Sequence, residues 1–185
     1  MTDPTAAALA RVVVVGCSGS GKSTLAQALA AAFAAPWVQL DALYWGPRWQ
    51  PRSEADFLHD VDAATRGPRW VVDGNYRRTR DIVWPRATAL VWLNYGFATV
   101  FGRSLRRTVA RGVTGEVLFS GNRESLWRAF TSRESILWWV ITSHARGRRD
   151  YCALAAGTCF PGLAWFELRR PADATRFLRS VAAVR

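Results

Sequence analysis

The amino-acid sequence predicts an α/β protein of three layers, in which helices cover both faces of a five-stranded parallel sheet. Short apolar runs alternate along the 185 residues with longer segments of helical composition. The first run, Arg11 to Val15, holds four consecutive valines, which is typical of a strand buried on both faces. Since 185 residues make one domain of ordinary size, we expect a single domain over residues 1–185.

The segment after the first strand continues this alternation. Residues Lys22 to Ala34 are rich in alanine and leucine and predict a helix, which Pro36 ends. Trp37 to Leu40 then predicts a second short strand, with Asp41 at its end.

A loop and a capped helix come next. Glycine and prolines interrupt Tyr44 to Arg52, which predicts a loop. Ser53 followed by Asp56 resembles a capping box and predicts a helix from Ser53 to about Thr65. Trp70 to Val72 is the third predicted strand, and a short helix or loop leads on to residue 85.

The second half of the chain supplies the last two strands. Thr88 to Leu93 predicts the fourth strand, and Phe97 to Arg111 an amphipathic helix. The apolar residues of this helix recur at helical spacing: Phe97, Val100, Phe101, Leu105 and Val109. The remaining predicted elements are a connection over Gly112–Asn122, a mostly helical Ser125–Ala145, a basic cluster at Arg146–Arg149, a strand at Leu163–Leu168 and a helix at Pro171–Val184.

The composition indicates a folded, strongly basic protein. Half of the residues are hydrophobic, and the formal net charge is +11. Such a charge suits polyanionic partners, namely nucleotides, nucleic acid or an anionic surface. Of the 25 basic residues only Lys22 is a lysine, so arginine has replaced lysine everywhere except there. A compact, mobile ammonium therefore has a use at that position that a planar guanidinium does not serve.

Other features narrow the setting. The longest apolar stretch, Ile136 to Ile141, is far shorter than the about 18 residues of a membrane span. The N-terminus lacks the pattern of a secretory signal. The three cysteines have no metal-ligand spacing, so we expect reduced thiols in a cytoplasmic protein that does not associate with membranes.

The glycine-rich segment between the first strand and the first helix matches the phosphate-binding template G-x-x-x-x-G-K-[ST] at every fixed position. Glycines allow the backbone to approach a phosphate, and N–H groups and the helix dipole favour its charge. Lys22 supplies mobile charge near the β- and γ-phosphates, and Ser23 offers a hydroxyl to Mg²⁺. We therefore expect ATP with Mg²⁺ to bind at the following residues: Gly16, Cys17, Ser18, Gly19, Ser20, Gly21, Lys22, Ser23 and Thr24.

Several classes of nucleotide-binding protein are excluded. A GTPase of this kind needs a further lysine in an Asn-Lys-x-Asp motif, and Lys22 is the only lysine. The chain is too short for a transporter ATPase or a ring-forming ATPase. This leaves chiefly the small kinases, in which a basic lid closes over the nucleotide.

Several segments resemble the adenylate-kinase-related P-loop proteins known as the "DNA topology modulation protein" group. The matching segments are Gly16–Thr24, Leu40-Asp41-Ala42-Leu43-Tyr44-Trp45, Trp70-Val71-Val72-Asp73-Gly74-Asn75-Tyr76, Gly121-Asn122-Arg123-Glu124 and Ser132–Leu137. The resemblance covers nearly the whole chain, in order. It implies a P-loop NTPase fold of nucleoside-monophosphate-kinase type, with a helical arginine-rich lid over about residues 112–149. In that group the fourth strand usually ends in Asp, whereas here it ends at Leu93 followed by Asn94. This chain therefore lacks that carboxylate at a strand end where ligands lie in open α/β sheets.

Two aspartates are candidate site residues. Asp73 follows the third strand and can hold Mg²⁺ or its water shell, the alternative being a helix cap. By resemblance to adenylate kinases, Asp73 begins an Asp-Gly-x-x-Arg stretch that ends at Arg77. Asp41 can accept a hydrogen bond from the hydroxyl of a phosphoryl acceptor, the alternative being a capped strand end beside packed aromatic rings. The predicted acceptor residues are Asp41, Tyr44, Trp45, Asn75, Tyr76, Arg77 and Arg123.

Arginines at helical spacing are candidates for phosphate contacts. Arg103, Arg107 and Arg111 lie four residues apart and are predicted to share a face opposite the apolar stripe. We expect Arg103 and Arg107 to offset charge on the transferring phosphoryl group, the alternative being a solvated face. A second set comprises Arg123, Arg128 and Arg133.

The functional hypothesis from the sequence is a kinase of adenylate-kinase type, with Lys22, Arg103, Arg107 and Asp73 as its catalytic residues. It would transfer the γ-phosphoryl group of ATP to a small nucleoside- or nucleotide-like acceptor. The alternative hypotheses are a nucleic-acid-associated protein that uses ATP as a switch, a nucleotide-binding regulatory protein with little catalysis, and an NTP hydrolase.

Overall fold

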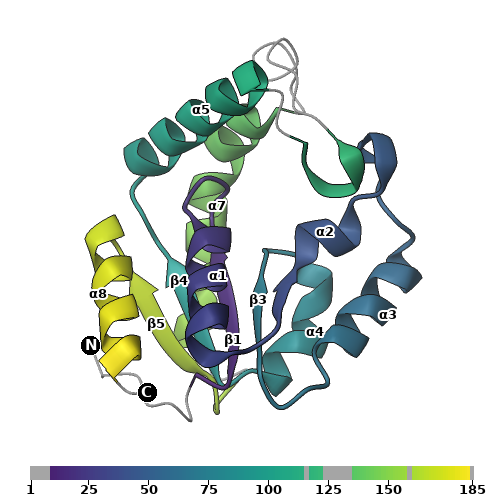
Figure 1. Ribbon diagram of the computed structural model, residues 1–185. Helices are drawn as coiled ribbons and strands as arrows, with labels where there is room; N and C mark the ends of the chain where they lie inside the picture. Colours follow the sequence, from purple (N-terminus) through teal and green to yellow (C-terminus); the bar gives the residue numbers. More distant parts are fainter. Residues whose placement is uncertain (1–8, 115–116, 123–134, 158–159, 184–185) are drawn as a thin grey trace.

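The computed structural model describes residues 9–114, 117–122, 135–157 and 160–183. Five strands form one parallel sheet in the order β2-β3-β1-β4-β5. The strands are β1 (Arg11–Gly16), β2 (Trp37–Gln39), β3 (Trp70–Asp73), β4 (Ala89–Leu93) and β5 (Ala164–Leu168). All five predicted strands are confirmed, and the predicted fold class is correct. The sheet stands at the centre of the molecule in Figure 1.

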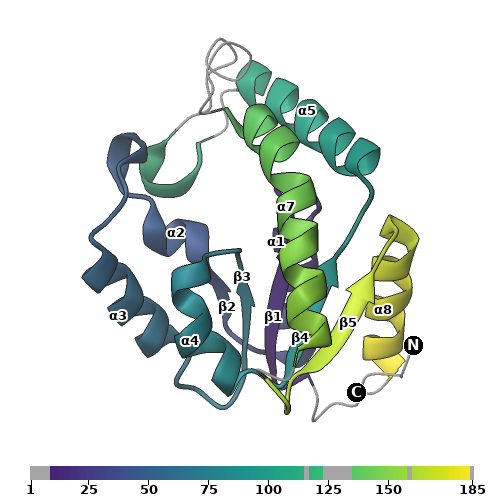
Figure 2. The same cartoon turned by 180° about the vertical axis from the view of Figure 1, so that it is seen from behind.

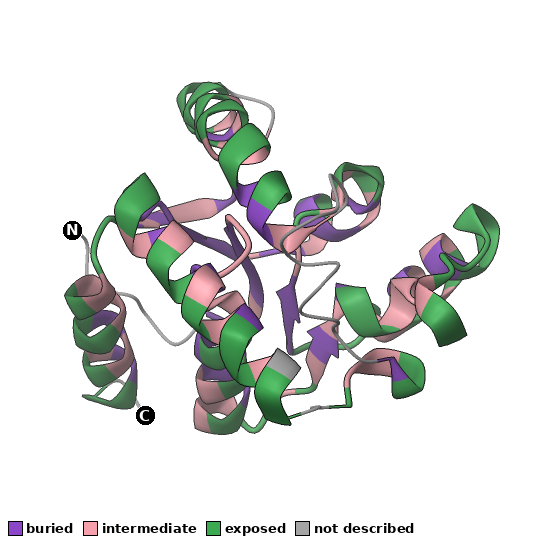
Figure 3. Ribbon diagram, turned by 90° about the horizontal axis from the view of Figure 1, so that it is seen from above, coloured by how far each residue is buried: buried purple, intermediate pink, exposed green. Residues whose placement is uncertain are grey.

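Helices cover both faces of the sheet, as predicted. On one face lie α1 (Lys22–Phe33) and α8 (Pro171–Ala183); on the other lie α3 (Glu54–Ala64), α4 (Arg80–Val83) and α7 (Ile136–Ala156) (Figures 1 and 2). Figure 3 shows purple strands between helices whose outer faces are green. The four valines of β1 divide between two cores, because side chains alternate along a strand. Val12 and Val14 pack with α1 and α8, and Val13 and Val15 with α3 and α4.

The register of the sheet places the loop after β1 between two neighbouring strand ends. Val14 pairs with Asp73 of β3, and Gly16 pairs with Leu93 of β4. Chain order reverses at β1, and in open α/β sheets ligands bind at the carboxyl ends of strands beside such a reversal. The phosphate-binding template therefore lies at the expected functional edge of the sheet.

Short elements connect the strands and helices. They are α2 (Leu40–Tyr44), η1 (Pro47–Trp49), η2 (Arg77–Thr79), η3 (Trp84–Arg86) and η4 (Phe119–Gly121). The prediction that Leu40 ends the second strand was wrong, because Leu40 and Asp41 already belong to α2. The predicted cap was correct, since the Ser53 side chain accepts a hydrogen bond from the Asp56 amide at 3.1 Å.

The helix α5 (Phe97–Thr114) differs from its predicted orientation. Val100, Ser104 and Thr108 are its buried positions, whereas Phe97 and Val109 of the predicted apolar stripe are 44% and 42% exposed. The buried face of α5 is thus partly polar, because this part of the helix packs on a loop rather than on the sheet.

The basic cluster at Arg146–Arg149 also lies in a different element from the one predicted. Arg146 to Arg149 do not follow a helix but lie within α7, which continues to Ala156. The predicted helix over Ser125–Ala145 falls partly outside the described residues. No helix within the described ranges is both long and apolar enough to cross a membrane.

Candidate functional site

The loop after β1 has the backbone that its glycines allow. Gly19 and Gly21 have φ angles of 81° and 95°, in the left-handed region that side chains disfavour. At Gly19 a Cβ atom would also lie 2.0 Å from the Ser104 Oγ of α5. Glycine is therefore required at Gly19 by both conformation and space.

The N-terminus of α1 offers donors to an anion. Its N-cap is Gly21, which has no side chain, and its first turn carries no acidic residue. Among the described residues, the backbone N–H groups of Gly19, Gly21 and Lys22 donate to no protein acceptor. Free amides at the positive end of a 12-residue helix suit a phosphate group. The backbone thus fits the triphosphate that the sequence template predicts.

Lys22 lies among groups of both signs. Its Nζ donates to the Cys17 carbonyl oxygen at 3.3 Å, so the side chain folds over the loop. Burial lowers the pKa of Lys22, while the charges of Asp41 and then Asp73 act in the opposite direction. The charges of the two predicted carboxylates, Asp41 and Asp73, therefore both act on the Lys22 ammonium.

Asp73 is buried at the end of β3, beside the first turn of α1. Burial raises the pKa of the Asp73 carboxyl, and a hydrogen bond from Ser23 and the charge of Lys22 partly offset this effect. Ser23 and Asp73 thus bring two oxygen ligands together. The described residues contain no group of three His, Cys, Asp or Glu side chains suited to a metal. A Mg²⁺ ion that takes its other ligands from phosphates and water fits this pair.

The helix α5 covers the loop with its arginine-bearing side. An Arg103 guanidinium nitrogen donates to the Ser20 carbonyl oxygen at 3.2 Å, and the Ser104 hydroxyl donates to the Ser18 carbonyl oxygen at 3.2 Å. Arg107 donates to the Ser18 hydroxyl at 3.4 Å. Two arginines predicted as catalytic therefore lie directly against the phosphate-binding loop.

The predicted acceptor residues form a cluster at the ends of β2 and β3. The Tyr76 hydroxyl donates to an Asp41 carboxylate oxygen at 2.7 Å. The Tyr44 ring lies 4.8 Å from the Tyr76 ring and 4.9 Å from the Trp45 ring, measured between centroids. Asp41, Tyr44, Trp45 and Tyr76 are thus brought together, as the sequence hypothesis requires.

Two other predicted acceptor residues have protein partners. The Asn75 side chain bonds to the backbone of Gly16. Arg77 is 74% exposed and lies 3.6 Å from the Asp150 carboxylate. Within the described residues, neither Asn75 nor Arg77 has a hydrogen bond or an ion pair with the acceptor cluster. Arg123, Arg128 and Arg133 lie outside the described residues.

The structure adds residues that sequence reasoning missed. Asn122 accepts a hydrogen bond from the Trp49 amide and donates to the Gly46 carbonyl oxygen, both at 2.9 Å. Ser120 donates to the Trp45 carbonyl oxygen at 2.7 Å. The chain that follows α5 is therefore bonded to the loop of the acceptor cluster. The Gly-Asn pair at 121–122 was the only signal in the sequence.

The structure also shows the surroundings of Asn94 and Cys17. Asn94, which stands where the related group has Asp, donates to a Glu167 carboxylate oxygen at 2.6 Å. Burial raises the pKa of the Cys17 thiol, and the charge of Lys22 acts in the opposite direction. No catalytic use of either residue follows from these contacts.

Comparisons with known proteins find similarity at the level of structure. No family model and no curated protein sequence matches the chain. A gluconokinase from Sinorhizobium meliloti 1021 is similar, with a TM-score of 0.50 at 20% identity over 95% of this chain and 91% of that chain. A shikimate kinase from Bacteroides thetaiotaomicron has a TM-score of 0.52 at 16% identity over 94% of this chain and 96% of that one. The chain therefore has the three-layer α/β fold of P-loop kinases, consistent with the nucleoside-monophosphate-kinase type.

Proposed function

We propose that this protein is a P-loop kinase that transfers the γ-phosphoryl group of ATP to a hydroxyl group of a small molecule. The observation that carries the proposal is the set of unpartnered backbone amides at the N-terminus of α1, beside Lys22. A switch protein would need these amides too, but the arginines and carboxylates around them suit phosphoryl transfer.

Charge on the loop side would stabilise the transferred group. In this proposal Lys22 moves from the Cys17 carbonyl oxygen to the β- and γ-phosphates. Arg103 and Arg107, which already contact loop residues, turn their guanidinium groups to the same phosphates. Phosphoryl transfer asks little bond-making of side chains, so positioning and charge supply most of the rate.

Ser23 and Asp73 would hold Mg²⁺. When bound, the ion would offset charge on the β- and γ-phosphate oxygens. The position of Asp73 at the end of β3, next to the strand that leads into the loop, supports this assignment. The buried Asp73 carboxylate is costly to keep charged, and a cation would compensate that cost.

Asp41 would accept the hydrogen bond of the acceptor hydroxyl. It is exposed, and the Tyr76 hydroxyl fixes its orientation. The rings of Tyr44 and Trp45 offer flat apolar surface beside it, which suits a nucleoside-like acceptor. Adenylate-kinase type, in the sense of this acceptor class, is part of the proposal.

Phosphate transfer to a panel of acceptors tests the function. The purified protein is incubated with γ-labelled ATP, Mg²⁺ and nucleosides, nucleoside monophosphates, sugars and other hydroxyl compounds. Label is expected in one class of acceptor, and Asp41→Asn is expected to reduce its transfer by at least about 100-fold. Label that appears only as inorganic phosphate, whatever acceptor is present, would contradict the kinase assignment and favour an NTP hydrolase.

The net charge of +11 favours one alternative function, a nucleic-acid-associated protein that binds ATP. Binding to duplex DNA would then fall steeply with salt, because bound arginines release counterions. Titration of labelled duplex DNA at several salt concentrations, with and without MgATP, separates the two functions. Tight DNA binding that ATP changes, together with no labelled acceptor, would favour the alternative.

A further inference from the structure

The Asn75 side chain forms a two-point clamp on the first residue of the phosphate-binding loop. The Gly16 amide donates to Asn75 Oδ1 at 3.1 Å, and Asn75 Nδ2 donates to the Gly16 carbonyl oxygen at 2.5 Å. A carboxamide has one donor group and one acceptor oxygen in a plane, so it can satisfy both backbone groups at once. An aspartate at this position would set an oxygen against the Gly16 carbonyl oxygen.

Gly16, the residue that Asn75 holds, has an unusual backbone conformation. Its φ angle is 150°, and a Cβ there would lie 2.8 Å from Ser20 Oγ and 2.9 Å from Leu93 Cβ. Gly16 is thus pressed between its own loop and β4, at the point where the strand turns into the loop. A shift of its backbone would displace the amides that follow.

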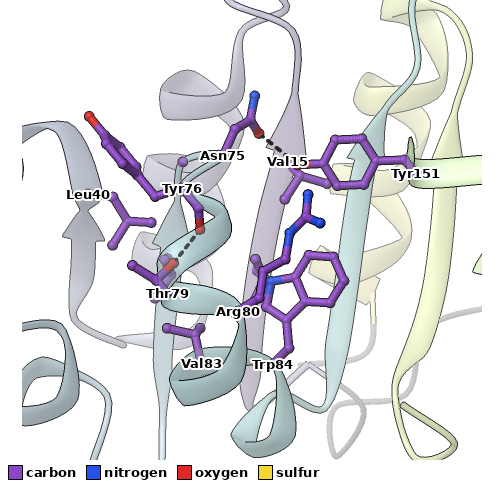
Figure 4. Close-up of a pocket in the computed structure, with 12 residues that line it drawn as sticks. Val15, Leu40, Asn75, Tyr76, Thr79, Arg80, Val83, Trp84 and Tyr151 are labelled. Atoms are coloured by element: carbon purple, nitrogen blue, oxygen red, sulfur yellow. Dashed lines mark hydrogen bonds between the residues drawn. The ribbon is translucent and has the colours of Figure 1, made fainter. Parts of the chain in front are cut away.

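A third contact connects this clamp to α7. The Tyr151 hydroxyl donates to Asn75 Oδ1 at 3.2 Å, the same oxygen that accepts from Gly16 (Figure 4). Tyr151 is buried, and the centroid of its ring lies 6.4 Å from that of the Trp84 ring. The Arg80 guanidinium carbon lies 5.3 Å from the centroid of the Tyr151 ring. Burial raises the pKa of Tyr151, so its hydroxyl keeps the proton that it donates.

The Asn75 side chain is exposed and lies at the edge of a hollow that packed side chains close. The hollow lined by Asn75, Tyr76, Arg80, Trp84 and Tyr151 leaves no room for a water molecule. Figure 4 shows the Arg80 side chain beside the Trp84 and Tyr151 rings, whereas the Tyr76 ring points away from this group. Although Asn75 is exposed, its hydrogen bonds within the described residues go to Gly16 and Tyr151 and not to the predicted acceptor cluster.

We propose that Asn75 is a positioning residue of the phosphate-binding loop, and that Tyr151 connects it to α7. Asn75 holds Gly16 so that the amides of the loop keep the geometry that a triphosphate needs. Tyr151 fixes the orientation of the Asn75 amide and thereby makes the loop sensitive to the placement of α7. This inference rests on the proposed function for its nucleotide, but not for the acceptor.

The same strand supplies a matched control. At the other end of β1, the Thr88 hydroxyl accepts from the Arg11 amide at 2.9 Å and donates to the Arg11 carbonyl oxygen at 3.0 Å. Thr88→Val therefore removes a two-point clamp of the same kind from the same strand, at the end far from the loop. Loss of stability alone would affect both variants, whereas loss of loop geometry would affect only Asn75→Ala.

Calorimetry of MgATP binding to the full chain tests the proposal. We expect Asn75→Ala to raise the Kd for MgATP about tenfold and Tyr151→Phe to raise it about threefold. Thr88→Val should bind MgATP as the unchanged protein does. In the double variant the effect of Tyr151→Phe should vanish, because its partner oxygen is already gone. Equal losses in Asn75→Ala and Thr88→Val, or additive losses in the double variant, would overturn the proposal.

Two further measurements keep this inference separate from the proposed function. In the protein without nucleotide, Asn75→Ala should speed hydrogen exchange of the Gly16 amide by at least about tenfold, and an unchanged rate would refute the clamp. In the kinase assay, Asn75→Ala should leave the KM of the acceptor unchanged. A raised acceptor KM with unchanged MgATP affinity would instead make Asn75 an acceptor contact. Failure of the unchanged protein to phosphorylate any acceptor would contradict the kinase function alone.

Discussion

Lys22 combines two requirements that oppose each other. Burial lowers its pKa, yet a phosphate site needs its positive charge. Asp41 and Asp73 support that charge, and a triphosphate would support it further. In the proposed function, the only lysine of the chain supplies the mobile charge of the phosphate site.

We predict that Lys22→Ala abolishes phosphoryl transfer, with a loss of at least about 1,000-fold in kcat. Lys22→Arg should lose nearly as much, because a planar guanidinium cannot replace the compact ammonium in the loop. Rates with labelled ATP measure both variants, and circular dichroism controls for folding. Full activity of Lys22→Ala would remove the basis of the proposed function.

Asn94 shows why a departure from a related group can be compensated locally. Its amide donates to Glu167 of the neighbouring strand, and Arg169 contacts the other Glu167 oxygen at 2.9 Å. These contacts lower the pKa of Glu167, Arg169 being the larger cause. An aspartate at position 94 would face the Glu167 carboxylate without a donor between them.

We predict that Asn94→Asp lowers the free energy of unfolding by about 1–3 kcal/mol, because it replaces a hydrogen bond with repulsion at a buried position. Adding Glu167→Gln should restore most of the loss, since its amide can donate to the new carboxylate. Urea unfolding of the two single variants and the double variant forms a thermodynamic cycle. Simple additivity in this cycle would show that the two side chains do not interact.

At the scale of elements, α5 and the phosphate-binding loop form one unit. Ser104 and Arg103 bond to loop carbonyl oxygens, and the packing is so close that Gly19 has no room for a methyl group. Ser104 faces the loop, because a larger side chain there would not fit beside Gly19.

We therefore predict that Gly19→Ala weakens MgATP binding at least about tenfold and destabilises the protein by about 1–3 kcal/mol. Ser104→Ala should restore part of the loss by removing the nearest atom, but the φ angle of 81° at Gly19 prevents full recovery. The control is Gly102→Ala, which lies in α5 with nothing within 4 Å of its Cβ and should be neutral or stabilising. Calorimetry and thermal unfolding measure the set, and equal behaviour of the two alanine variants would contradict this account.

An ion-pair cluster joins two elements at the opposite edge of the sheet. Asp62 of α3 bonds to Arg86 of η3 and to Arg66, and Arg86 also donates to the Thr65 hydroxyl at 3.1 Å. These contacts, Arg86 first, lower the pKa of Asp62. A lowered carboxyl pKa contributes stability above the ordinary value of 3.8, and that stability is lost as the pH falls through the value in the folded state.

We predict that Asp62→Asn lowers the urea midpoint at pH 7, and that the difference from the unchanged protein shrinks as the pH falls from about 5 to about 2. Urea unfolding at several pH values measures this convergence. A difference that stays constant over the whole range would show that the charge of Asp62 is not its contribution.

At the scale of the whole molecule, one sheet carries two cores and a site. The buried valines of β1 hold both helical layers, and the loop leaves the sheet where β1 ends between β3 and β4. A ligand at this junction touches elements from both layers, so its binding should stabilise the entire fold.

We predict that MgATP at about 100 times its Kd stabilises the protein by about 2.7 kcal/mol, which corresponds to a rise of roughly 5–10 °C in Tm. Thermal unfolding over a series of MgATP concentrations measures the rise. Lys22→Ala should abolish most of it. A Tm that is independent of MgATP would contradict nucleotide binding itself.

The sequence alone was sufficient to predict the fold class and the position of the glycine-rich loop. The five strands and the capping of α3 follow from local pattern, because short continuous apolar runs and side-chain caps involve near neighbours in the sequence. Gly19, Gly21 and Lys22 were also identified from spacing, since a phosphate loop is built from consecutive residues.

Only the tertiary structure decided which side chains support that loop. Asn75 bonds to Gly16 across 59 positions of the chain, and Tyr151 reaches Asn75 across 76. The orientation of α5 and the pairing of Asn94 with Glu167 are long-range contacts as well. Such contacts depend on how strands and helices meet in space, and no local pattern of residues specifies that meeting.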